Sequence, residues 1–473
     1  MRVLIVNPPG EGDARYVREG RCEQRVSSFQ YLMVPISLPS TAAVLREGGH
    51  DVSLVDCIAE RMPLPELLAL VRRADPGLVV LNVATATFAG DSAVGRAIRE
   101  ASGAHVTAIG VHVTTLPAET LASGAVDSVI RREPELTAAA LADALAAGSP
   151  LAEVEGISYL DGGEARHNPD RPFATDLDSL PFPARDLLHN ERYLAPASDK
   201  VQTLVVTGRG CPHGCTYCTA HTYYGSRLRT RSAASIVDEM QECVERFGVE
   251  VVTMWADTFT ADREQVLAVC DEIEWRGLAV EWMCNSRVDT VDRELLRRMA
   301  RAGCSTMSYG VESGVQEVLD GVRKGITLQQ VRDAFRWTRE AGILSAAHVI
   351  LGLPGETPET IRETERFVRE IAPDFVQFYC AVPFPGTRFF EQAREAGWLV
   401  TDDWSRFEIN QAVVSTPALS AEQLARARRA AYRGFYLRPG YIAIRLLAAG
   451  SPKAAARLAR RGVDFMRDWV GVR

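Results

Sequence analysis

Short apolar runs alternate with stretches of helical periodicity through the first part of the chain. The apolar runs predict strands at residues 3–6, 52–55, 78–83, 106–109 and 126–130. Amphipathic stretches predict helices between them, at residues 40–47, 64–73, 89–101 and 135–147. Strands that alternate with helices in this way form a parallel, doubly wound sheet. We therefore expect an α/β domain over residues 1–150, with a ligand site at the carboxyl ends of its strands.

A second series of strand–loop–helix patterns begins after residue 200. It predicts strands at residues 204–207, 251–255, 280–284, 306–309, 345–351 and 375–379. These are fewer than the eight strands of a closed (β/α)8 barrel, so we expect a partial barrel over residues 200–390. The stretch 151–199, rich in Pro, Asp and Gly, predicts a linker with a small hairpin at 156–168. Residues 391–473 are expected to form a helical C-terminal domain.

Composition is that of a soluble globular protein with two or three domains. The chain has 473 residues, of which 47% are apolar and 24% charged. No apolar run reaches the roughly 18 residues of a membrane-spanning helix, and the first run ends at Pro8 and Pro9, which fits a buried strand rather than a secretory signal. Ten cysteines without a regular framework indicate a reducing cytoplasm. The net charge of −8 gives no general affinity for nucleic acid.

One loop, residues 208–218, carries the strongest chemical signal. It reads GRGCPHGCTYC, directly follows a predicted strand, and spaces three cysteines as C-x3-C-x2-C, namely Cys211, Cys215 and Cys218. Three thiolates this close can hold three irons of a cubane cluster and leave the fourth iron open to a small molecule. The alternative is a zinc site with His213 or His221 as the fourth ligand. Zinc motifs usually need a second cysteine pair, and the chain has none in C-x2-C spacing beside this one.

With the aromatic Tyr217 before its last cysteine, this loop resembles the signature of the radical S-adenosylmethionine (SAM) enzymes. The resemblance implies a [4Fe–4S] cluster whose open iron is chelated by SAM. Reductive cleavage of SAM then gives a 5′-deoxyadenosyl radical, with electrons from a donor such as flavodoxin or ferredoxin. The resemblance makes the three cysteines the catalytic and metal-ligating residues.

The strand ends of the predicted barrel carry polar residues that match SAM-binding positions of that family. The resemblance implies that Asp257 accepts from the ammonium group of SAM, that Arg287 pairs with its carboxylate, and that Glu312 accepts from the ribose or the ammonium. Ser286 stands beside Arg287 in the same loop. Gly352 leaves its backbone bare for the adenine, which Tyr217 also contacts. Because these positions follow successive strands, we expect them to converge on one site.

The N-terminal sheet resembles the cobalamin-binding domain of the B12-dependent radical SAM subfamily. The resemblance rests on the phrase NPP, the threonines after the third strand, and G-x-H-x-T followed by Pro-Ala-Glu. It implies that cobalamin contacts the strand-end loops through Pro8, Thr85, Thr87, Gly110, His112 and Glu133. The D-x-H-x-x-G loop is absent after the first strand, so we expect no protein histidine on the lower face of cobalt. A turn histidine bonded to backbone is favoured for His112 over a cobalt ligand, and the fold alone would equally suit a flavin or no ligand.

The remaining cysteines show no spacing for a second cluster; they are Cys22, Cys57, Cys243, Cys270, Cys284, Cys304 and Cys380. This argues against methylthiotransferases and against members with auxiliary clusters. Cys380 is favoured as a core thiol, although it follows the sixth strand and could face substrate. His348, on the fifth strand, either reaches substrate or is a hydrogen-bonded core histidine.

The C-terminal tail is basic, with 12 Lys and Arg against 3 Asp and Glu from Ala421 to Arg473. Its Tyr-Leu-Arg-Pro phrase also occurs in relatives of the anaerobic magnesium-protoporphyrin cyclase and in hopanoid-associated proteins. Two amphipathic stretches carry the apolar residues Tyr441, Ile442, Ile444, Leu446, Leu447, Leu458, Phe465, Met466 and Trp469. Intramolecular capping of the barrel is favoured over peripheral contact with an anionic membrane.

Three functions are considered. The first is a cobalamin-dependent radical SAM methyltransferase that methylates an unactivated carbon of a small-molecule, natural-product or lipid-like substrate. The second uses the same cofactors for oxidative cyclisation or another rearrangement. The third, a non-enzymatic electron-transfer or sensor protein, leaves the SAM-type loops unexplained. A doubly wound lid beside a barrel meets the need to bring three reactants together, which favours the first.

Overall fold

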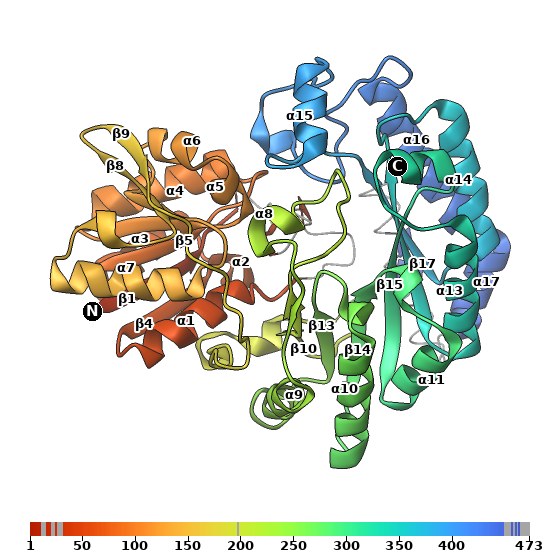
Figure 1. Ribbon diagram of the computed structural model, residues 1–473, viewed down its shortest axis with the longest axis horizontal. Helices are drawn as coiled ribbons and strands as arrows, with labels where there is room; N and C mark the ends of the chain where they lie inside the picture. Colours follow the sequence, from red (N-terminus) through yellow and green to blue (C-terminus); the bar gives the residue numbers. More distant parts are fainter. Residues whose placement is uncertain are drawn as a thin grey trace.

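Two large sheets, one mostly and one entirely parallel, organise the chain, and they lie side by side in the structure (Figure 1). The computed structural model describes residues 1–10, 16–19, 24–25, 32–195, 198–448, 456, 459–460 and 462–463. The first sheet and its helices form the N-terminal lobe. The second sheet, with the helices that follow each of its strands, forms the larger C-terminal lobe.

The N-terminal sheet has the strand order β4-β1-β5-β6-β7-β8-β9. Its first five strands in chain order are parallel, and they confirm the predicted doubly wound sheet. From β1 the chain adds β4 on one side and the later strands, beginning with β5, on the other side. Doubly wound sheets bind ligands at this switch point between β1 and β5. The strands are β1 (Arg2–Asn7), β4 (Asp51–Asp56), β5 (Leu78–Asn82), β6 (His105–Ile109), β7 (Ser128–Ile130), β8 (Ile157–Asp161) and β9 (Glu164–His167).

Alternate residues of the central strands pack against helices on opposite faces. One face buries Leu4, Val6, Val79 and Leu81 under α3 (Leu64–Ala74) and α4 (Phe88–Ala101). The other buries Val3, Ile5, Leu78 and Val80 under α1 (Ser37–Glu47) and α7 (Glu135–Ala147). Successive side chains of a strand point to opposite faces, and both faces are covered here. The strands therefore appear in the sequence as continuous apolar runs, which is why the pattern located them.

The predicted hairpin is confirmed as β8 and β9, which pair antiparallel with each other and with β7. It extends the N-terminal sheet past residue 150, where the sequence pattern placed the end of this domain. The expected loop after β6 instead forms two short helices, α5 (Val111–Thr115) and α6 (Pro117–Ala122). A further short helix, α2 (Cys57–Glu60), follows β4.

Two buried residues, Arg185 and Tyr193, fasten the linker to both lobes. Arg185 pairs with Glu239 of α9 (Ala233–Phe247) at 2.5 Å, and both side chains are fully buried. The same guanidinium donates to the carbonyl oxygen of Leu204 in β10 at 2.6 Å. On the other side, the Tyr193 hydroxyl donates to the carboxylate of Asp56 at the end of β4, at 2.7 Å. The linker is therefore part of the packed structure rather than a loose tether.

The second sheet is a parallel, open, partial barrel. Its strands pair in chain order, β10-β13-β14-β15-β16-β17, and they confirm the six strands predicted. β10 and β17 are its edges and do not pair with each other, so the barrel stays open. The strands are β10 (Gln202–Val206), β13 (Val251–Trp255), β14 (Glu281–Ser286), β15 (Cys304–Glu312), β16 (Leu344–Leu351) and β17 (Phe375–Cys380).

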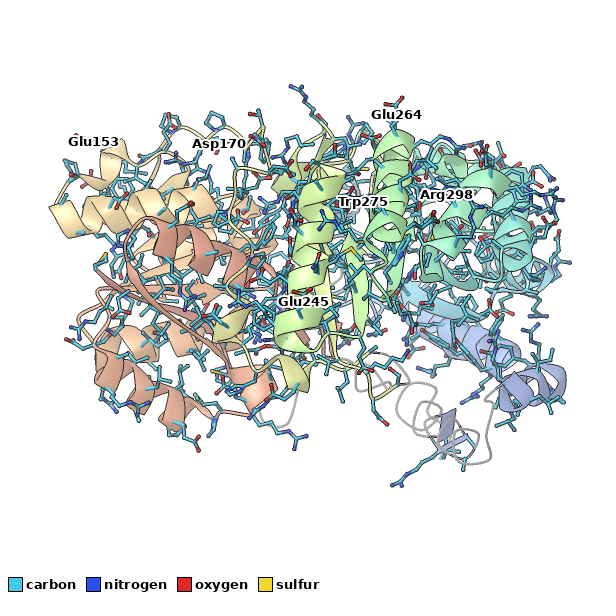
Figure 2. The ribbon with its side chains drawn as sticks, turned by 90° about the horizontal axis from the view of Figure 1, so that it is seen from below. Glu153, Asp170, Glu245, Glu264, Trp275 and Arg298 are labelled. Atoms are coloured by element: carbon cyan, nitrogen blue, oxygen red, sulfur yellow. The ribbon has the colours of Figure 1, made fainter. Side chains whose placement is uncertain are left out.

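Helices after the strands cover the outside of the barrel. They are α9, α10 (Arg263–Arg276), α11 (Arg293–Arg301), α13 (Leu328–Glu340) and α14 (Pro358–Ile371). Each begins at a residue whose side chain accepts from a backbone N–H of the first turn, as helix N-caps do; these are Ser232, Asp262, Asp292, Thr327 and Thr357. Their outer faces are polar, as Glu245, Glu264 and Arg298 illustrate (Figure 2). Trp275, at the end of α10, is an exception with 81% of its surface exposed.

The helix α16 (Ala421–Tyr436) covers the open edge strand β17. The Tyr432 hydroxyl accepts from the backbone N–H of Phe378 at 3.1 Å. The Tyr436 hydroxyl accepts from the N–H of Val376 at 3.0 Å and donates to the carbonyl of the same residue at 2.8 Å. Arg428 donates to the Phe378 carbonyl at 2.8 Å. Side chains of α16 thus satisfy the backbone groups that a neighbouring strand would otherwise pair.

The C-terminal segment from residue 391 is helical only in part. Helix α15 (Arg388–Glu395) is followed by a loop with one 3-10 turn, Trp404–Arg406, and an isolated bridge between Leu399 and Val414. This loop stays irregular because its apolar side chains, including Phe407, pack into a core cluster beside the barrel mouth. Trp404 reaches the N-terminal lobe, where its ring nitrogen donates to Glu119 at 2.7 Å.

The predicted amphipathic tail falls only partly within the described residues. Leu458, Phe465, Met466 and Trp469 lie outside them. The last fully described helix is α17 (Pro439–Ala448), in which the Tyr441 hydroxyl donates to the Asp374 carbonyl at 2.8 Å. Ile444 and Leu447 of the same helix are 62% and 84% exposed. None of the described helices is both long and apolar enough to span a membrane.

Candidate active site

The cysteine-bearing segment 208–218, here called the cluster loop, is held at its neck by a short antiparallel ladder. β11 (Gly208–Arg209) pairs with β12 (Arg229–Thr230). Gly210 follows with φ +86°, and a Cβ at this position would lie 2.2 Å from the Arg227 carbonyl oxygen. Only glycine fits such a turn without strain. The ladder and the turn together direct the three cysteines over the barrel mouth.

All three cysteines line one cavity of about 220 Å³ at the carboxyl ends of the barrel strands. We call it the barrel cavity. Cys211 is buried, whereas Cys215 and Cys218 are half-buried. Burial raises the pKa of the Cys215 thiol, and the neighbouring Lys324 opposes that rise. A metal that binds the thiolate would overcome this cost.

The geometry does not favour the zinc alternative. Among the residues that the structure describes, no three His, Cys, Asp or Glu side chains are placed to share a single metal ion. His221 is used elsewhere, since its Nε2 donates to the Cys211 carbonyl oxygen at 2.7 Å. Cysteines of a cubane cluster bind separate irons and do not meet at one point. The cluster loop therefore fits a [4Fe–4S] cluster.

Most of the predicted SAM-binding residues line the barrel cavity together with the cysteines. They come from the cluster loop and from the ends of β13, β14 and β15, and they are Tyr217, Asp257, Ser286, Arg287 and Glu312. The carboxyl ends of parallel strands meet at one edge of a sheet, which explains the convergence. The cavity also contains Asn285 and Lys324, which the sequence prediction did not assign.

Arg287 is already held by other groups. Its guanidinium donates to both carboxylate oxygens of Asp289, at 2.8 and 2.9 Å, and to the Lys324 carbonyl at 2.8 Å. Burial works against its charge, but these partners outweigh burial and raise the pKa of Arg287. The guanidinium is thus fixed and largely neutralised by a carboxylate of its own loop.

Lys324 is the charged residue of the cavity that sequence analysis missed. It lies after the short helix α12 (Gln316–Gly321), and its Nζ is 2.7 Å from Glu312 Oε1. The sequence gives only a weak signal that Lys324 is buried. It stands two residues from each of two apolar residues, Val322 and Ile326, which are themselves buried. A lysine in a polar stretch is normally exposed to solvent. Only the ion pair with Glu312 therefore shows that Lys324 lies in the barrel cavity.

Gly352 is not among the residues that line the barrel cavity. It has φ +91°, and a Cβ here would lie 2.5 Å from Leu424 of α16. Its N–H donates to the carboxylate of Glu356, which is buried deeply enough to raise the pKa of that carboxyl to about 8. The glycine therefore serves a tight turn under α16, and adenine contact at this position stays a prediction without geometric support.

The remaining wall of the barrel cavity is mostly apolar. It is formed by Ile350, Cys380, Ala381, Val382, Phe384 and Ile409. His348 and Tyr379 provide polar groups on this wall, with Nδ1 of the histidine 2.8 Å from the tyrosine hydroxyl and the rings stacked at 5.7 Å. His348 thus lies in the cavity. Cys380 also lines it, and burial raises the pKa of its thiol to about 12.

In the N-terminal lobe, the predicted cobalamin contacts lie at the strand ends but are engaged with the protein itself. Arg18 donates to the Pro8 carbonyl at 3.0 Å and to the Thr87 hydroxyl at 3.1 Å. Thr85 is buried beside them. Gly110 has φ +130°, and a Cβ there would lie 2.2 Å from the Val83 carbonyl oxygen, so this loop needs glycine for its own packing.

His112 is not the backbone-bonded turn histidine that the sequence favoured. It is fully buried, and neither ring nitrogen has a hydrogen-bond partner among the described residues. Its ring packs 4.4 Å from Phe88 and 5.4 Å from Trp404. Trp404, from a loop far along the chain, covers the histidine and keeps it from the exposed turn position. Burial lowers the pKa of His112 to about 4.

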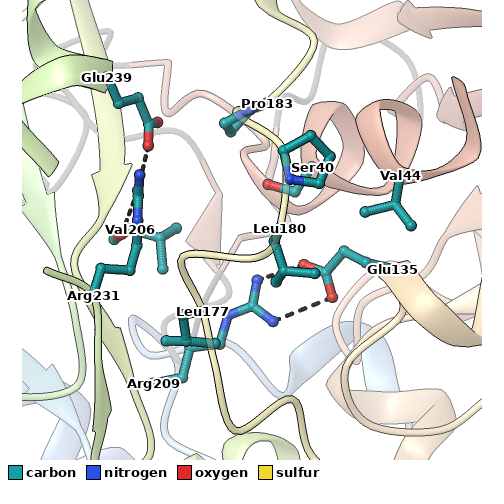
Figure 3. A pocket seen from close by; sticks show the side chains of 11 residues that line it. Ser40, Val44, Glu135, Leu177, Leu180, Pro183, Val206, Arg209, Arg231 and Glu239 are labelled. Atoms are coloured by element: carbon teal, nitrogen blue, oxygen red, sulfur yellow. Dashed lines mark hydrogen bonds and ion pairs between the residues drawn. The ribbon is translucent and has the colours of Figure 1, made fainter. Parts of the chain in front are cut away.

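Glu133, the last predicted cobalamin contact, belongs to an ion-pair cluster between the lobes. It pairs with Arg229 at 2.6 Å and lies 3.6 Å from Arg209. Arg209 also pairs with Glu135 of α7 at 2.5 Å. Figure 3 shows this pair beside a small cavity of about 30 Å³. Both arginines belong to the β11–β12 ladder, so the neck of the cluster loop is anchored directly to the N-terminal lobe.

These features define an enzyme class: a partial barrel with a three-cysteine cluster loop at its mouth, joined to a doubly wound domain. Family comparisons agree, because residues 205–368 match the Radical SAM superfamily and residues 25–142 match the B12 binding domain. An uncharacterized methyltransferase of Pyrococcus horikoshii is 31% identical over 442 residues, covering 93% of each chain. The chain belongs to the cobalamin-dependent radical SAM family.

Other relatives and solved structures extend this picture. The anaerobic magnesium-protoporphyrin IX monomethyl ester cyclase of Cereibacter sphaeroides is 27% identical over 405 residues, covering 84% of this chain and 66% of the cyclase. The radical SAM methyltransferase TsrM from Kitasatospora setae has a TM-score of 0.73 at 19% identity, covering 93% of this chain and 89% of TsrM. The cobalamin-dependent radical enzyme OxsB has a TM-score of 0.75 at 16% identity, covering 98% of this chain and 72% of OxsB. The structural likenesses show a shared two-lobe fold.

The cofactors of this family are a [4Fe–4S] cluster, SAM and cobalamin. The barrel cavity fits the first two, because it brings three thiols together with charged and hydroxyl groups. In the N-terminal lobe, Gly110 lines a small cavity of about 20 Å³ together with Tyr223 of α8 (Ala220–Tyr224). The residues that the resemblance assigns to cobalamin stand at the carboxyl ends of the strands, where doubly wound sheets bind ligands.

Proposed function

We propose that this protein is a cobalamin-dependent radical SAM methyltransferase that methylates an unactivated carbon of a small molecule. The observation that carries the proposal is the division of the barrel cavity. One part holds the three cysteines and the charged strand-end residues, and the other is a mostly apolar wall beside them. A cavity of this kind suits a carbon substrate held next to SAM, away from water.

The roles of the residues follow from their places. Cys211, Cys215 and Cys218 hold three irons of the cluster, and the missing fourth protein ligand leaves room for SAM. Asp257, Ser286 and Glu312 hold the polar groups of SAM. When bound, the cluster and SAM supply a 5′-deoxyadenosyl radical, and cobalamin supplies the methyl group. The apolar wall keeps water away from the reacting carbon, while His348 and Tyr379 offer hydrogen bonds to a polar group of the substrate.

For the N-terminal lobe we propose that Pro8, Thr85, Thr87 and Gly110 contact cobalamin, with no protein histidine on the lower face of cobalt. Their places at the carboxyl ends of the strands support this. Glu133 is better explained as a partner of Arg229. The domain limits at residues 200 and 390 also remain our proposal, whereas the limit at residue 150 is replaced by the end of β9 at His167.

An external electron donor such as flavodoxin or ferredoxin and a cytoplasmic location complete the proposal. Peripheral membrane contact through the C-terminal helices is a further hypothesis, supported by the exposed side chains of Ile444 and Leu447. Co-sedimentation with anionic liposomes at two salt concentrations tests it. Absence of binding at both concentrations would remove it.

Cyclisation is the second candidate, favoured by the 27% identity to the anaerobic cyclase. The deciding experiment is an anaerobic turnover assay with reconstituted enzyme, a reductant and candidate substrates, read by mass spectrometry. A methyltransferase yields a product heavier by one CH₂ group together with 5′-deoxyadenosine. A cyclase yields a product without the added carbon, and a sensor yields neither product.

The cluster assignment is tested separately. Reconstitution should load about four irons per chain, and Cys211→Ala, Cys215→Ala and Cys218→Ala should each abolish SAM cleavage. Cys270→Ala, at a buried thiol of α10 outside the cavity, is the matched control and should retain the cluster. Loading of about eight irons would instead indicate a second cluster.

A further inference from the structure

The outer side of the cluster loop faces solvent. Pro212 and Gly214 are exposed, and a Cβ built on Gly214 would meet no other atom within 4 Å. Both residues lie between Cys211 and Cys215 in the sequence. A protein that docks on this stretch therefore rests on the backbone that joins two of the cluster ligands.

Two exposed arginines flank the middle of the cluster loop. Arg323 directly follows Val322, whose carbonyl oxygen accepts from the N–H of Thr216 at 3.1 Å. Arg388 begins α15 and directly precedes Phe389, whose N–H donates to the carbonyl oxygen of Thr216 at 2.9 Å. Both arginine side chains are exposed. Backbone hydrogen bonds thus fix the two arginines beside a single residue of the loop.

A third exposed arginine, Arg227, stands at the neck of the loop, where its carbonyl oxygen packs against Gly210. We call Arg227, Arg323 and Arg388 the arginine rim. Within the described part of the chain, the side chains of these three make no hydrogen bond or ion pair. Their positive charges are therefore presented to solvent around the exposed backbone of the cluster loop.

The charge of the rim is opposite to that of the chain as a whole. Acidic residues outnumber Lys and Arg by 61 to 53, yet the segment from Lys200 to Val237, which contains the cluster loop, has no Asp or Glu. The buried arginines of the β11–β12 ladder are paired with glutamates of the N-terminal lobe, whereas the rim arginines keep their charge for solvent. An acidic protein is therefore repelled by the net charge of the chain but attracted to the face that carries the rim.

We propose that the arginine rim is the docking face for an acidic flavodoxin that reduces the cluster. The inference rests on the proposed function in that the cluster loop holds a [4Fe–4S] cluster, which must be reduced before SAM is cleaved. The flavin of the donor loses one electron as it passes from hydroquinone to neutral semiquinone, and the oxidised cluster gains that electron, so no proton has to move. Electron transfer slows steeply with distance, and the rim brings the donor to the exposed backbone between two cluster ligands.

Attraction between the rim and an acidic donor raises the rate of encounter and is weakened by salt. Arg323→Glu/Arg388→Glu should lower the second-order rate constant for reduction by flavodoxin by about tenfold or more at low salt. Arg323→Lys/Arg388→Lys keeps the charge and should stay within about threefold of the wild type. Added salt should slow the wild type and bring it toward the charge-reversed variant.

The test is stopped-flow reduction of the reconstituted cluster, followed by its visible absorbance, with purified flavodoxin hydroquinone as the reductant. The same proteins are reduced in parallel by photoreduced 5-deazariboflavin, a small uncharged reductant that needs no docking face. Arg297→Glu/Arg301→Glu is the matched control, because it changes the net charge equally at exposed side chains of α11. This helix leads into the amino end of β15, opposite the barrel cavity, so flavodoxin should reduce the control as fast as the wild type.

Iron content shows whether each variant holds its cluster. If Arg323→Glu/Arg388→Glu does not, Arg227→Glu alone replaces it and should also slow reduction by flavodoxin. Slower reduction by flavodoxin in the rim variant alone, with unchanged reduction by 5-deazariboflavin, supports the docking face. An unchanged flavodoxin rate in the rim variant, an equal loss in the control, or an equal loss with both reductants would overturn the inference.

Failure of the docking face and failure of the proposed function can be told apart. A wild-type protein that forms methylated product with 5-deazariboflavin as reductant, while its flavodoxin rate does not depend on the rim, refutes only the docking face. A wild-type protein that loads no cluster refutes the proposed function as well.

Discussion

Substitution of Arg209 tests how much its ion pair stabilises the contact between the two lobes. Its guanidinium lies 2.5 Å from Glu135, and the two side chains are only 7% and 4% exposed. Burial works against the charge of Arg209, but Glu135 and Glu133 outweigh it and raise the pKa of the guanidinium. Removing one partner of such a buried pair costs about 3–5 kcal/mol, because the other charge stays buried without compensation. Replacing both partners by apolar residues often changes the free energy of unfolding very little.

We therefore expect Arg209→Met to lower the free energy of unfolding by about 3–5 kcal/mol. Glu135→Leu should cost less, since Arg209 then keeps Glu133 at 3.6 Å. The double variant should lie within about 2 kcal/mol of the wild type. The assay is urea denaturation followed by tryptophan fluorescence and circular dichroism, and coincident curves are needed before free energies are compared.

A matched control comes from Arg2, which pairs with Asp75 at the same distance of 2.5 Å but with side chains 55% and 73% exposed. Arg2→Met should cost less than about 1 kcal/mol, as surface pairs do. If Arg2→Met and Arg209→Met cost the same, burial is not what makes the pair between the lobes important. Additive effects of the two single variants in the double variant would likewise refute the reasoning.

Three further predictions concern single side chains. Tyr432→Phe removes the acceptor of the Phe378 N–H on the edge strand and should cost about 1–3 kcal/mol in the same denaturation assay; an unchanged free energy would show that α16 does not satisfy that edge. Burial raises the pKa of Glu356 from 4.5 to about 8, so the folded state keeps a proton that the unfolded state releases. Stability should fall as pH rises across that window and then level off, and the slope should be absent in Glu356→Gln. Electron paramagnetic resonance of the cob(II)alamin-loaded protein should show no nitrogen splitting from the protein, and a splitting that disappears in His112→Ala would contradict this.

The strands of both sheets could be predicted because the burial of each strand is evident from its own short stretch of sequence. Residues such as Val79 and Val80 face helices on opposite sides of one strand, so the run is apolar throughout. The convergence of Asp257, Ser286 and Glu312 could also be predicted, since the carboxyl ends of parallel strands meet at one edge.

The site residues that the sequence did not predict correctly depend on contacts between segments far apart in the chain. Lys324 stands in a polar stretch, and only its pairing with Glu312 makes it a cavity residue. A glycine such as Gly352 signals a need for backbone freedom but not its cause, which here is Leu424 of α16. His112 was predicted to be a turn histidine, but Trp404, from a loop near the other end of the chain, covers it. No local pattern encodes these partners.

The tyrosines on α16 have a consequence for how the barrel could be dissected or redesigned. Tyr432 and Tyr436 bind backbone groups two residues apart on β17, at Phe378 and Val376, which is the spacing at which an adjacent strand would bond. The helix thus acts as a substitute strand whose hydrogen bonds come from side chains. A fragment that ends before Ala421 would present a bare strand edge to other copies of itself. We expect such a fragment to assemble into intermolecular sheets, so the minimal expressible barrel must include α16.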